Sequence, residues 1–326
     1  MLSEPLHDSS AQSNTKTQVS IDPRIQNISY SSLLTLHSCP RKFQLEKYKA
    51  IRSSQDSESD TITFSYGHTV GHGIQLCLEE HSYENVLWEM FLMWHAELFA
   101  ENPKQNKSFA SAVYAIQKFR AMRAQGYLEG YSLVQYNGKP ACELSFLIHL
   151  PGGFKYRGSV DAVLQHNETG KIIVLECKTS SATNLDAAKY RNSAQAIGYS
   201  IVLDSIFPEL SSYDVLYIEF STKTLQWEQL TFSKSYTQRA RWIQELVLDV
   251  EVIGMYEDSG TYPMHGESCL AWNRECKYLG LCHMSDHLLM TDITPADIVE
   301  IEKDYAKWEI KVTLEDLINT QIAKTT

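Results

Sequence analysis

The chain has 326 residues, of which 43% are hydrophobic and 21% are charged, as is typical of a globular protein with one large domain or two modest ones. No apolar run approaches the roughly 18 residues that a membrane span needs, and the polar N-terminal stretch lacks the apolar centre of a secretion signal. We therefore expect a cytoplasmic protein with no membrane partner and with reduced cysteines. The net charge of −11 argues mildly against nucleic-acid binding by bulk charge, although bound cations or a basic groove reverse the sign locally.

The N-terminal half is predicted to be helical. Residues 1–27 read as a flexible tail rich in serine, threonine, glutamine and asparagine. A helical pattern over 29–48 is interrupted at Cys39-Pro40, where the proline suits the first turn of a second helix. After a polar loop, the hydrophobic periodicity predicts three more helices, near 66–81, 84–100 and 108–131.

After Leu133 the hydrophobic period changes to two, which predicts a sheet. We expect an α/β fold in which helices flank a mixed central β-sheet. One domain would span 28–290, with a helical part at about 60–131, a sheet core at about 133–232 and a cysteine segment at 260–285, followed by a C-terminal helix and tail at 291–326. The predicted elements are strands near 141–150, 154–166, 171–179, 213–220 and 225–231, and helices near 185–204, 235–255 and 295–307.

Two carboxylates and a lysine stand out on neighbouring strands. Asp161 ends Gly-Ser-Val-Asp, and Glu176 and Lys178 share one face of the next strand. An even-length hairpin loop that pairs His166 with Lys171 sets Asp161 opposite Glu176, at a span that suits one shared cation. Oxygen ligands with open positions suit Mg²⁺ or Mn²⁺, which would activate water beside a phosphodiester. A solvated hairpin face is the alternative, but the apolar residues before Glu176 favour a central strand.

These residues resemble the PD-(D/E)XK nuclease superfamily in its RecB-like branch, which has a Gly-x-x-Asp strand, a Glu-x-Lys strand and a Gln-x-x-x-Tyr helix. The third motif reads Gln195-Ala-Ile-Gly-Tyr199 here. The resemblance implies a restriction-endonuclease-like fold, metal binding by Asp161 and Glu176, a catalytic Lys178, and a catalytic site lined on its DNA-binding side by Gln195 and Tyr199. Independently, Gln195 and Tyr199 share one helix face, for which plain helix packing is the alternative.

The RecB-like branch usually adds a metal-binding histidine on an early helix, in a Gly-x-x-x-His arrangement. The chain departs from this pattern in Gly67-His-Thr-Val-Gly-His72, where each histidine is displaced from the expected spacing. We expect His72 to be the third metal ligand, with His68 or no histidine as the alternatives. Glu143 on the preceding strand is a candidate for supporting the site, and a surface role is its alternative.

Four of the seven cysteines have the spacing of cluster ligands. Cys269, Cys276 and Cys282 lie in a loop-rich segment, and Cys39 lies upstream at the helix break. Four thiolates fit a [4Fe–4S] cluster or a structural zinc ion, but zinc sites usually come from two C-x2-C pairs, which the chain lacks. The early Cys-Pro and the late trio resemble the iron–sulfur RecB-like nucleases, which include AddB and CRISPR-associated exonucleases. That resemblance implies a [4Fe–4S] cluster site closed by the cysteine segment.

The combined expectation is a metal-dependent DNA nuclease that acts as an exonuclease on single-stranded ends. It would serve recombination, repair or CRISPR-type adaptation, with a helicase or a CRISPR-adaptation protein as a partner. The alternatives are a non-catalytic nucleic-acid-binding subunit and an RNA-directed nuclease.

Overall fold

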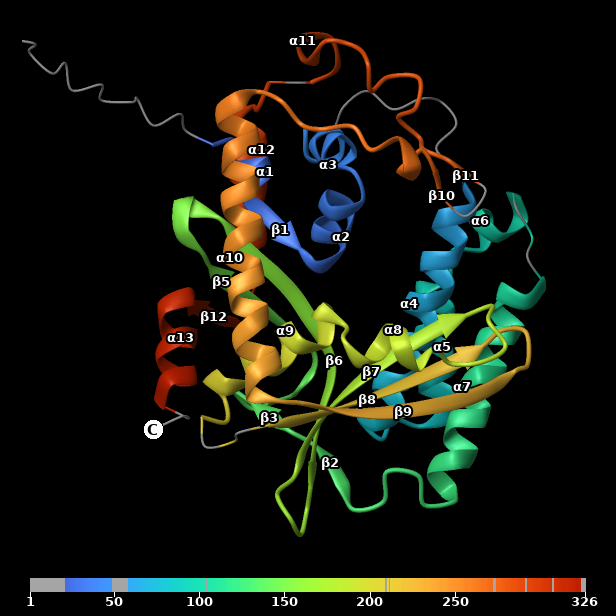
Figure 1. Cartoon of the computed structure of the whole chain (residues 1–326). Coiled ribbons are helices and arrows are strands. Elements are labelled where there is room, and N and C mark those ends of the chain that lie inside the picture. The colour runs from blue at the N-terminus through green and yellow to red at the C-terminus, as the bar shows by residue number, and fades with distance from the viewer. Residues whose placement is uncertain are drawn as a thin grey trace, which may run out of the picture.

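A mixed sheet forms the centre of the protein. The computed structural model describes residues 21–48, 58–101, 103, 105–208, 210, 212–271, 274–290, 292–306 and 308–323. The strand order is β12-β5-β6-β7-β8-β9, with β1 and β2 also paired to β6 (Figure 1). The pairs β5–β6, β6–β7 and β8–β9 are antiparallel. The pairs β7–β8 and β12–β5 are parallel. The strands are β1 (Asn27–Ser29), β2 (Tyr131–Leu133), β5 (Cys142–His149), β6 (Lys155–His166), β7 (Ile172–Ser180), β8 (Tyr213–Ser221), β9 (Gln226–Lys234) and β12 (Ile310–Thr313).

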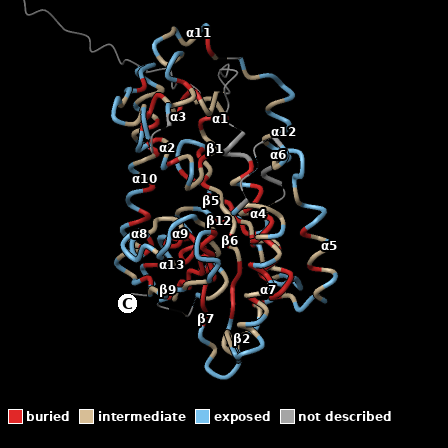
Figure 2. Tube along the Cα trace, turned by 90° about the vertical axis from the view of Figure 1, so that its right-hand side faces the viewer, coloured by how far each residue is buried: buried red, intermediate tan, exposed pale blue. Residues whose placement is uncertain are grey.

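Helices cover both faces of the sheet, and each face has its own apolar core. On one face α4 (Glu58–Leu78), α5 (Tyr83–Met93) and α7 (Phe109–Ala124) pack against side chains of β7 and β8. On the other face lie α2 (Tyr30–Ser38), α9 (Ala194–Val202) and α10 (Tyr236–Ser259). Figure 2 shows the buried segments concentrated in the strands and on the inner sides of these helices. The predicted α/β architecture is therefore confirmed.

The remaining short elements connect or edge this core. They are α1 (Pro23–Gln26), α3 (Pro40–Lys47), α6 (Ala96–Glu101), α8 (Ala187–Arg191), α11 (Asp286–Leu289), α12 (Pro295–Ala306), α13 (Leu314–Ala323) and the two-stranded pairs β3 (Gln135–Tyr136) with β4 (Lys139–Pro140) and β10 (Leu270–Ala271) with β11 (Arg274–Glu275). No helix in the described ranges is long and apolar enough to cross a membrane.

Several predicted helices differ from the observed ones. The helix expected over 84–100 breaks at Trp94, whose backbone is extended (ψ 126°) and whose ring packs against Phe99 and Phe109. The helix expected to reach 131 ends at Ala124, because Gly126 adopts a left-handed conformation with φ 93°. The helix expected over 185–204 is divided into α8 and α9 by a non-helical Ser193 (ψ 115°).

The two ends of the chain also differ from the prediction. Of the expected N-terminal tail (1–27), residues 1–20 lie outside the described residues. Residues 23–27 are not a tail but form α1 and the start of β1. After residue 307 the expected tail contains β12, which pairs with β5, and α13, which packs on α10. Only Ile310 and Val312 of β12 are buried, so the alternating pattern is too short to be recognised in the sequence.

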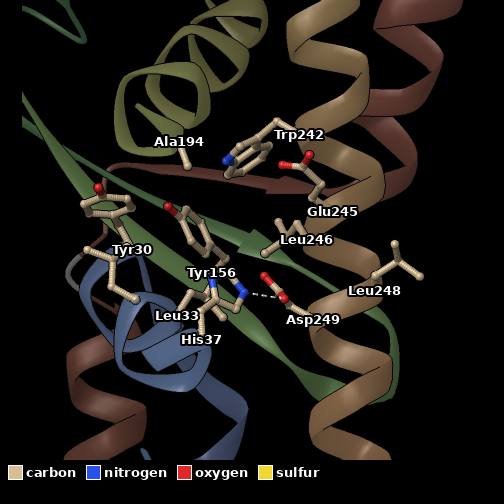
Figure 3. A pocket seen from close by; sticks show the side chains of 11 residues that line it. Tyr30, Leu33, His37, Tyr156, Ala194, Trp242, Glu245, Leu246, Leu248 and Asp249 are labelled. Carbon is tan, nitrogen blue, oxygen red and sulfur yellow. Dashed lines mark hydrogen bonds and ion pairs between the residues drawn. The ribbon is translucent and has the colours of Figure 1, made fainter. Parts of the chain in front are cut away.

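An apolar pocket of about 220 Å³ lies between α2, α10 and the first turn of α9. The rings of Tyr30, Tyr156 and Trp242 lie at one end of it, and an ion pair between His37 Nε2 and Asp249 Oδ1 (2.7 Å) lies at the other (Figure 3). The pocket thus joins α2, which leads into Cys39, to the long helix α10.

Candidate active site

Asp161 and Glu176 lie opposite each other across β6 and β7. The His166 N–H donates to the Lys171 carbonyl at 2.8 Å, as the hairpin count predicted, and the ladder runs in that register to Ala162 and Leu175. At the next position the ladder stops. The Oδ2 atom of Asp161 accepts a hydrogen bond from the Cys177 N–H at 2.8 Å, so a side chain replaces the main-chain acceptor there.

At Asp161, the side chains of β6 switch from one face of the sheet to the other. Val160 packs into the core beneath α9 and α10, whereas Ala162 packs into the core beneath α4. The same switch occurs on β5, where Leu144 packs into the core beneath α9 and α10 and Cys142 packs against the core beneath α4. Glu143 lies between them with φ 48°, a left-handed conformation that interrupts the alternation of side chains. Asp161 therefore lies where two paired strands switch faces together, which the simple alternation in the sequence did not reveal.

Glu176 is fully buried, and its carboxylate is incompletely satisfied. Its Oε1 atom is ion-paired with Lys178 Nζ. Its Oε2 atom, also buried, has no hydrogen-bond partner among the described residues. A buried, unpaired carboxylate oxygen is costly, so its position beside Asp161 fits an oxygen-binding cation.

Lys178 is held by a chain of polar contacts that leads to α9. Its Nζ atom also donates to Gln195 Oε1 at 3.2 Å, and Gln195 Nε2 donates to the Tyr199 hydroxyl at 2.6 Å. Tyr199 packs edge-on against Phe146, with ring centroids 5.8 Å apart. The structure therefore brings together all five residues that the resemblance placed in the catalytic site: Asp161, Glu176, Lys178, Gln195 and Tyr199.

The charges of the site perturb one another strongly. Burial and the neighbouring Glu176 charge hold the pKa of Asp161 well above its usual range. Burial also raises the pKa of Glu176, against the lowering effect of the Lys178 ammonium. For Lys178, burial lowers the pKa but the two carboxylates more than offset this, so the pKa is raised and the ammonium stays charged. Two like charges this close call for a cation or a proton between them.

The two candidate histidines lie on α4. His68 is exposed and His72 is half-buried, in a part of the helix where Gly67 faces Thr179 at the end of β7. In the described ranges, no three His, Cys, Asp or Glu side chains are gathered as ligands of a single ion. Neither histidine therefore joins Asp161 and Glu176 in this structure, and the choice between them stays a prediction.

Two further acids lie near the pair. Glu143 accepts a hydrogen bond from Ser159 Oγ at 2.9 Å, and its charge contributes to the raised pKa of Asp161. Glu219, the β8 neighbour of Lys178, is buried but accepts from Ser180 Oγ and the Tyr190 hydroxyl, each at 2.5 Å. Both oxygens of Glu219 are thus occupied, in contrast to Glu176. The sequence analysis missed Glu219, because nothing local in the strand distinguishes it.

The four candidate cluster cysteines converge at the other end of the molecule. Cys39 lies between α2 and α3, with Pro40 in the first turn of α3 as predicted. All four thiols are free. Burial, followed by the adjacent thiols of Cys276, Cys282 and Cys39, raises the pKa of Cys269. The other three thiols are therefore close enough to Cys269 for their charges to influence it.

An arginine that the sequence analysis did not single out docks the cysteine segment. Arg41 donates through Nε to the Cys282 carbonyl (3.1 Å) and through Nη2 to the Met284 carbonyl (3.0 Å). Its Nη1 atom pairs with Asp286, which also accepts from Gln44 Nε2 at 3.2 Å. Residues more than 240 positions apart are joined in this way, so the signal is tertiary and absent from local sequence.

A central mixed sheet that carries an aspartate on one strand and a Glu-x-Lys pair on the next defines a restriction-endonuclease-like nuclease fold. The chain belongs to the PD-(D/E)XK nuclease superfamily, whose family model matches residues 27–283. No curated protein matches the chain.

Among solved structures, the chain is similar to a Eubacterium rectale protein with a provisional exonuclease assignment. The two share 12% identity with a TM-score of 0.46, over 89% of this chain and 98% of that one. A second similar structure, SSO0001, shares 15% identity with a TM-score of 0.34, over 79% of this chain and 86% of that one. At these values neither likeness carries an argument about activity.

Proposed function

We propose that the protein is a metal-dependent DNA exonuclease that acts on single-stranded ends. Membership of the nuclease superfamily supports phosphodiester hydrolysis. The preference for single-stranded ends, the [4Fe–4S] cluster and a role in recombination, repair or CRISPR-type adaptation rest on the resemblance to the RecB-like branch.

The observation that carries the proposal is the orphaned Oε2 atom of Glu176. This buried oxygen lies beside Asp161, and no protein donor among the described residues satisfies it. A buried carboxylate with a purely structural role would have both oxygens hydrogen-bonded, as Glu219 has through two hydroxyl groups. An oxygen left open next to a second carboxylate favours the binding of a hard cation.

Asp161 and Glu176 would hold Mg²⁺ or Mn²⁺, with His72 as the candidate third ligand. When bound, the ion supplies charge neutralisation on the phosphate and an acidified water. Two protein ligands suffice in such sites, since Mg²⁺ commonly keeps several waters. Lys178 offers a charged N–H group that Glu176 and Gln195 hold in place, and it would stabilise negative charge on the reacting phosphate. Tyr199 fixes the orientation of the Gln195 amide.

The four cysteines would hold the [4Fe–4S] cluster. Their thiols influence one another electrostatically, yet in the described ranges no three of them are drawn together as ligands of one ion. The choice of a cluster over a single zinc ion rests on the resemblance to the iron–sulfur RecB-like nucleases and on the lack of two C-x2-C pairs. With Cys39 and the 269–282 segment as ligands, the cluster would reinforce the contact that Arg41 already makes.

A cleavage assay tests the nuclease proposal. Anaerobically purified protein is offered 5′- and 3′-end-labelled single-stranded DNA, duplex DNA and single-stranded RNA, each with Mn²⁺, Mg²⁺ or EDTA. We expect metal-dependent release of short products from single-stranded DNA, lost in Asp161→Ala and Lys178→Ala. Binding without cleavage would identify a nucleic-acid-binding subunit instead, and preferential cleavage of RNA would overturn the choice of substrate.

A further inference from the structure

The connection between β7 and α9, residues 181–193, carries two exposed cations and one acid. The acid, Asp186, caps α8 by accepting from the backbone N–H groups of Ala188 and Lys189. The cations are Lys189 and Arg191, both exposed. Two cations and one acid give this segment a net charge of +1, in a chain whose net charge is −11.

The middle of this connection is anchored to the floor of the catalytic site. The Tyr190 hydroxyl donates to Glu219 Oε2 at 2.5 Å, and the Tyr190 ring packs at a tilt of 32° against Tyr217, with centroids 4.4 Å apart. In the β7–β8 register, Tyr217 is the partner of Glu176, and Glu219 is the partner of Lys178. Tyr190 is itself only 3% exposed, so α8 packs on β8, the strand next to the one that carries Glu176 and Lys178.

Both ends of the connection are fixed as well. Near its start, Ser221 Oγ donates to the Ala182 carbonyl at 2.5 Å and the Leu185 N–H donates to Glu228 Oε2 at 2.8 Å. At its end, the buried Lys234 Nζ donates to the Arg191 carbonyl at 2.7 Å. A segment held at three places keeps the α-carbons of its exposed residues in set positions.

The two cations themselves are uncommitted. Lys189 Nζ lies 5.1 Å from the centre of the Tyr190 ring, and the Arg191 guanidinium lies 5.7 Å from that of Phe232. Neither forms an ion pair with a carboxylate of the described residues. Aromatic faces position a cation without neutralising it, so both charges remain available to an anionic ligand.

We propose that α8 is a fixed phosphate-binding platform, on which Lys189 and Arg191 contact backbone phosphates of the DNA strand adjacent to the scissile one. This inference rests on the proposed function and adds where the substrate strand runs: across α8, on the side of the sheet covered by α9. Glu219 and Tyr190 act as positioning residues that set the height of the platform above Lys178.

The test is the salt dependence of DNA binding. Fluorescence anisotropy with a labelled 12-nucleotide oligothymidylate, in EDTA, gives the affinity of the wild type and of Lys189→Ala/Arg191→Ala at several KCl concentrations. Each phosphate contact to a single strand contributes about 0.7 to the slope of log affinity against log salt, so we expect the slope to fall by about 1.4. At about 0.1 M salt this corresponds to a loss of affinity on the order of tenfold or more.

A charge-matched control is Lys139→Ala/Lys303→Ala, which removes two exposed cations from β4 and α12, elements that carry no site residue. Its slope should stay within about 0.3 of the wild type. Equal slopes for the two double variants would overturn the platform. The wild type is tested in parallel for cleavage of the same oligonucleotide with Mn²⁺, so that a failure of the nuclease proposal is seen separately. Absence of wild-type binding would overturn the platform as well.

Discussion

The Oδ2 atom of Asp161 accepts a hydrogen bond from the backbone N–H of Cys177 at 2.8 Å, one position beyond the last paired residues of β6 and β7. This bond fixes the aspartate next to Glu176, where the two negative charges repel each other. The protein fold thus maintains an arrangement that is unfavourable without a cation. Active sites commonly trade stability for function in this way, and the trade can be measured.

Replacing Asp161 by asparagine should abolish cleavage and stabilise the metal-free protein. The raised pKa of Asp161 means that the folded state binds its proton more tightly than the unfolded state. The stabilisation from this tighter proton binding is complete at pH values below 3.8, the pKa of the aspartate in the unfolded chain. It is lost as pH rises through the pKa of the folded state. The variant should therefore gain on the order of 1 kcal/mol over the wild type at pH 8 and much less at pH 4.

Urea unfolding in EDTA at both pH values measures this difference in the free energy of unfolding. Glu168→Gln, at the exposed tip of the same hairpin, is the control and should change neither stability nor cleavage. A less stable Asp161→Asn at pH 8 would show that the aspartate is a structural residue.

The hairpin that carries Asp161 and Glu176 was predictable because its register depends only on loop length and alternation. Pairing His166 with Lys171 sets the pairs of β6 and β7 as far as Ala162 and Leu175, and Asp161 and Glu176 follow at the next position. The third motif followed from helical spacing, which places Gln195 and Tyr199 on one face. Local rules thus gave both the sheet and the centre of the site.

The rest of the site depends on contacts that no local rule contains. The left-handed glutamate at 143 has no propensity signal, since glycine or asparagine would be expected at φ 48°. Arg41 meets Asp286 across 245 residues, and Tyr190 meets Glu219 through the packing of α8 on β8. The third metal ligand stayed open because helix spacing alone cannot decide which histidine turns toward β7.

Removal of Lys178 should destabilise the protein in a pH-dependent manner. In Lys178→Met, the buried Glu176 loses its counter-charge, so its already raised pKa rises further. Stability is then retained at low pH and lost as pH rises through that pKa. We expect a loss of about 1–3 kcal/mol at pH 8, shrinking toward pH 5, together with loss of cleavage.

Gln195→Ala serves as the comparison for Lys178→Met, because it keeps the Glu176–Lys178 pair. It should lower cleavage while changing the free energy of unfolding by less than about 1 kcal/mol. A pH-independent loss in Lys178→Met would mean that Glu176 does not depend on the lysine for its charge.

Cys276→Ser should remove the iron–sulfur cluster. With only three thiolates the site loses a ligand, so we expect iron and acid-labile sulfide to fall well below four per chain and the broad absorption near about 400 nm to fade. Cys142→Ala, a cysteine on β5, should keep both. A colourless wild-type protein with one zinc per chain would contradict the cluster and leave the nuclease proposal standing.

The His37–Asp249 pair should stabilise the contact between α2 and α10 at low pH, and this stabilisation should be lost as pH rises. The hydrogen bond to Asp249 raises the pKa of His37, and Glu245 on the same helix adds to this effect. The stabilisation is complete below the unfolded value near 6.5 and is lost above the folded pKa. Because the histidine side chain is 57% exposed, Asp249→Asn should cost no more than about 1 kcal/mol at pH 6, and nothing by pH 9. Thermal unfolding of the wild type and of Asp249→Asn between pH 6 and pH 9 measures this loss of stability. An equal difference in melting temperature at both pH values would exclude the titration of His37 as its cause.

The glycine of Gly-x-x-Asp, Gly158, makes room for α9, the helix whose Gln195 contacts Lys178. A Cβ atom at Gly158 would lie 2.6 Å from Phe146 Cζ and 3.4 Å from Tyr199 Cε1. Both rings are packed in the core, so Gly158→Ala should cost about 1–3 kcal/mol and shift Tyr199, which orients Gln195. Cleavage should fall more than the folded fraction does, as judged by circular dichroism at the assay temperature.

Gly254→Ala is the matched control: it lies within α10 with no atom within 4 Å of the new Cβ, so it should stabilise the protein by about 0.5–1 kcal/mol. Equal stability of the two alanine variants would show that Phe146 and Tyr199 move aside without cost.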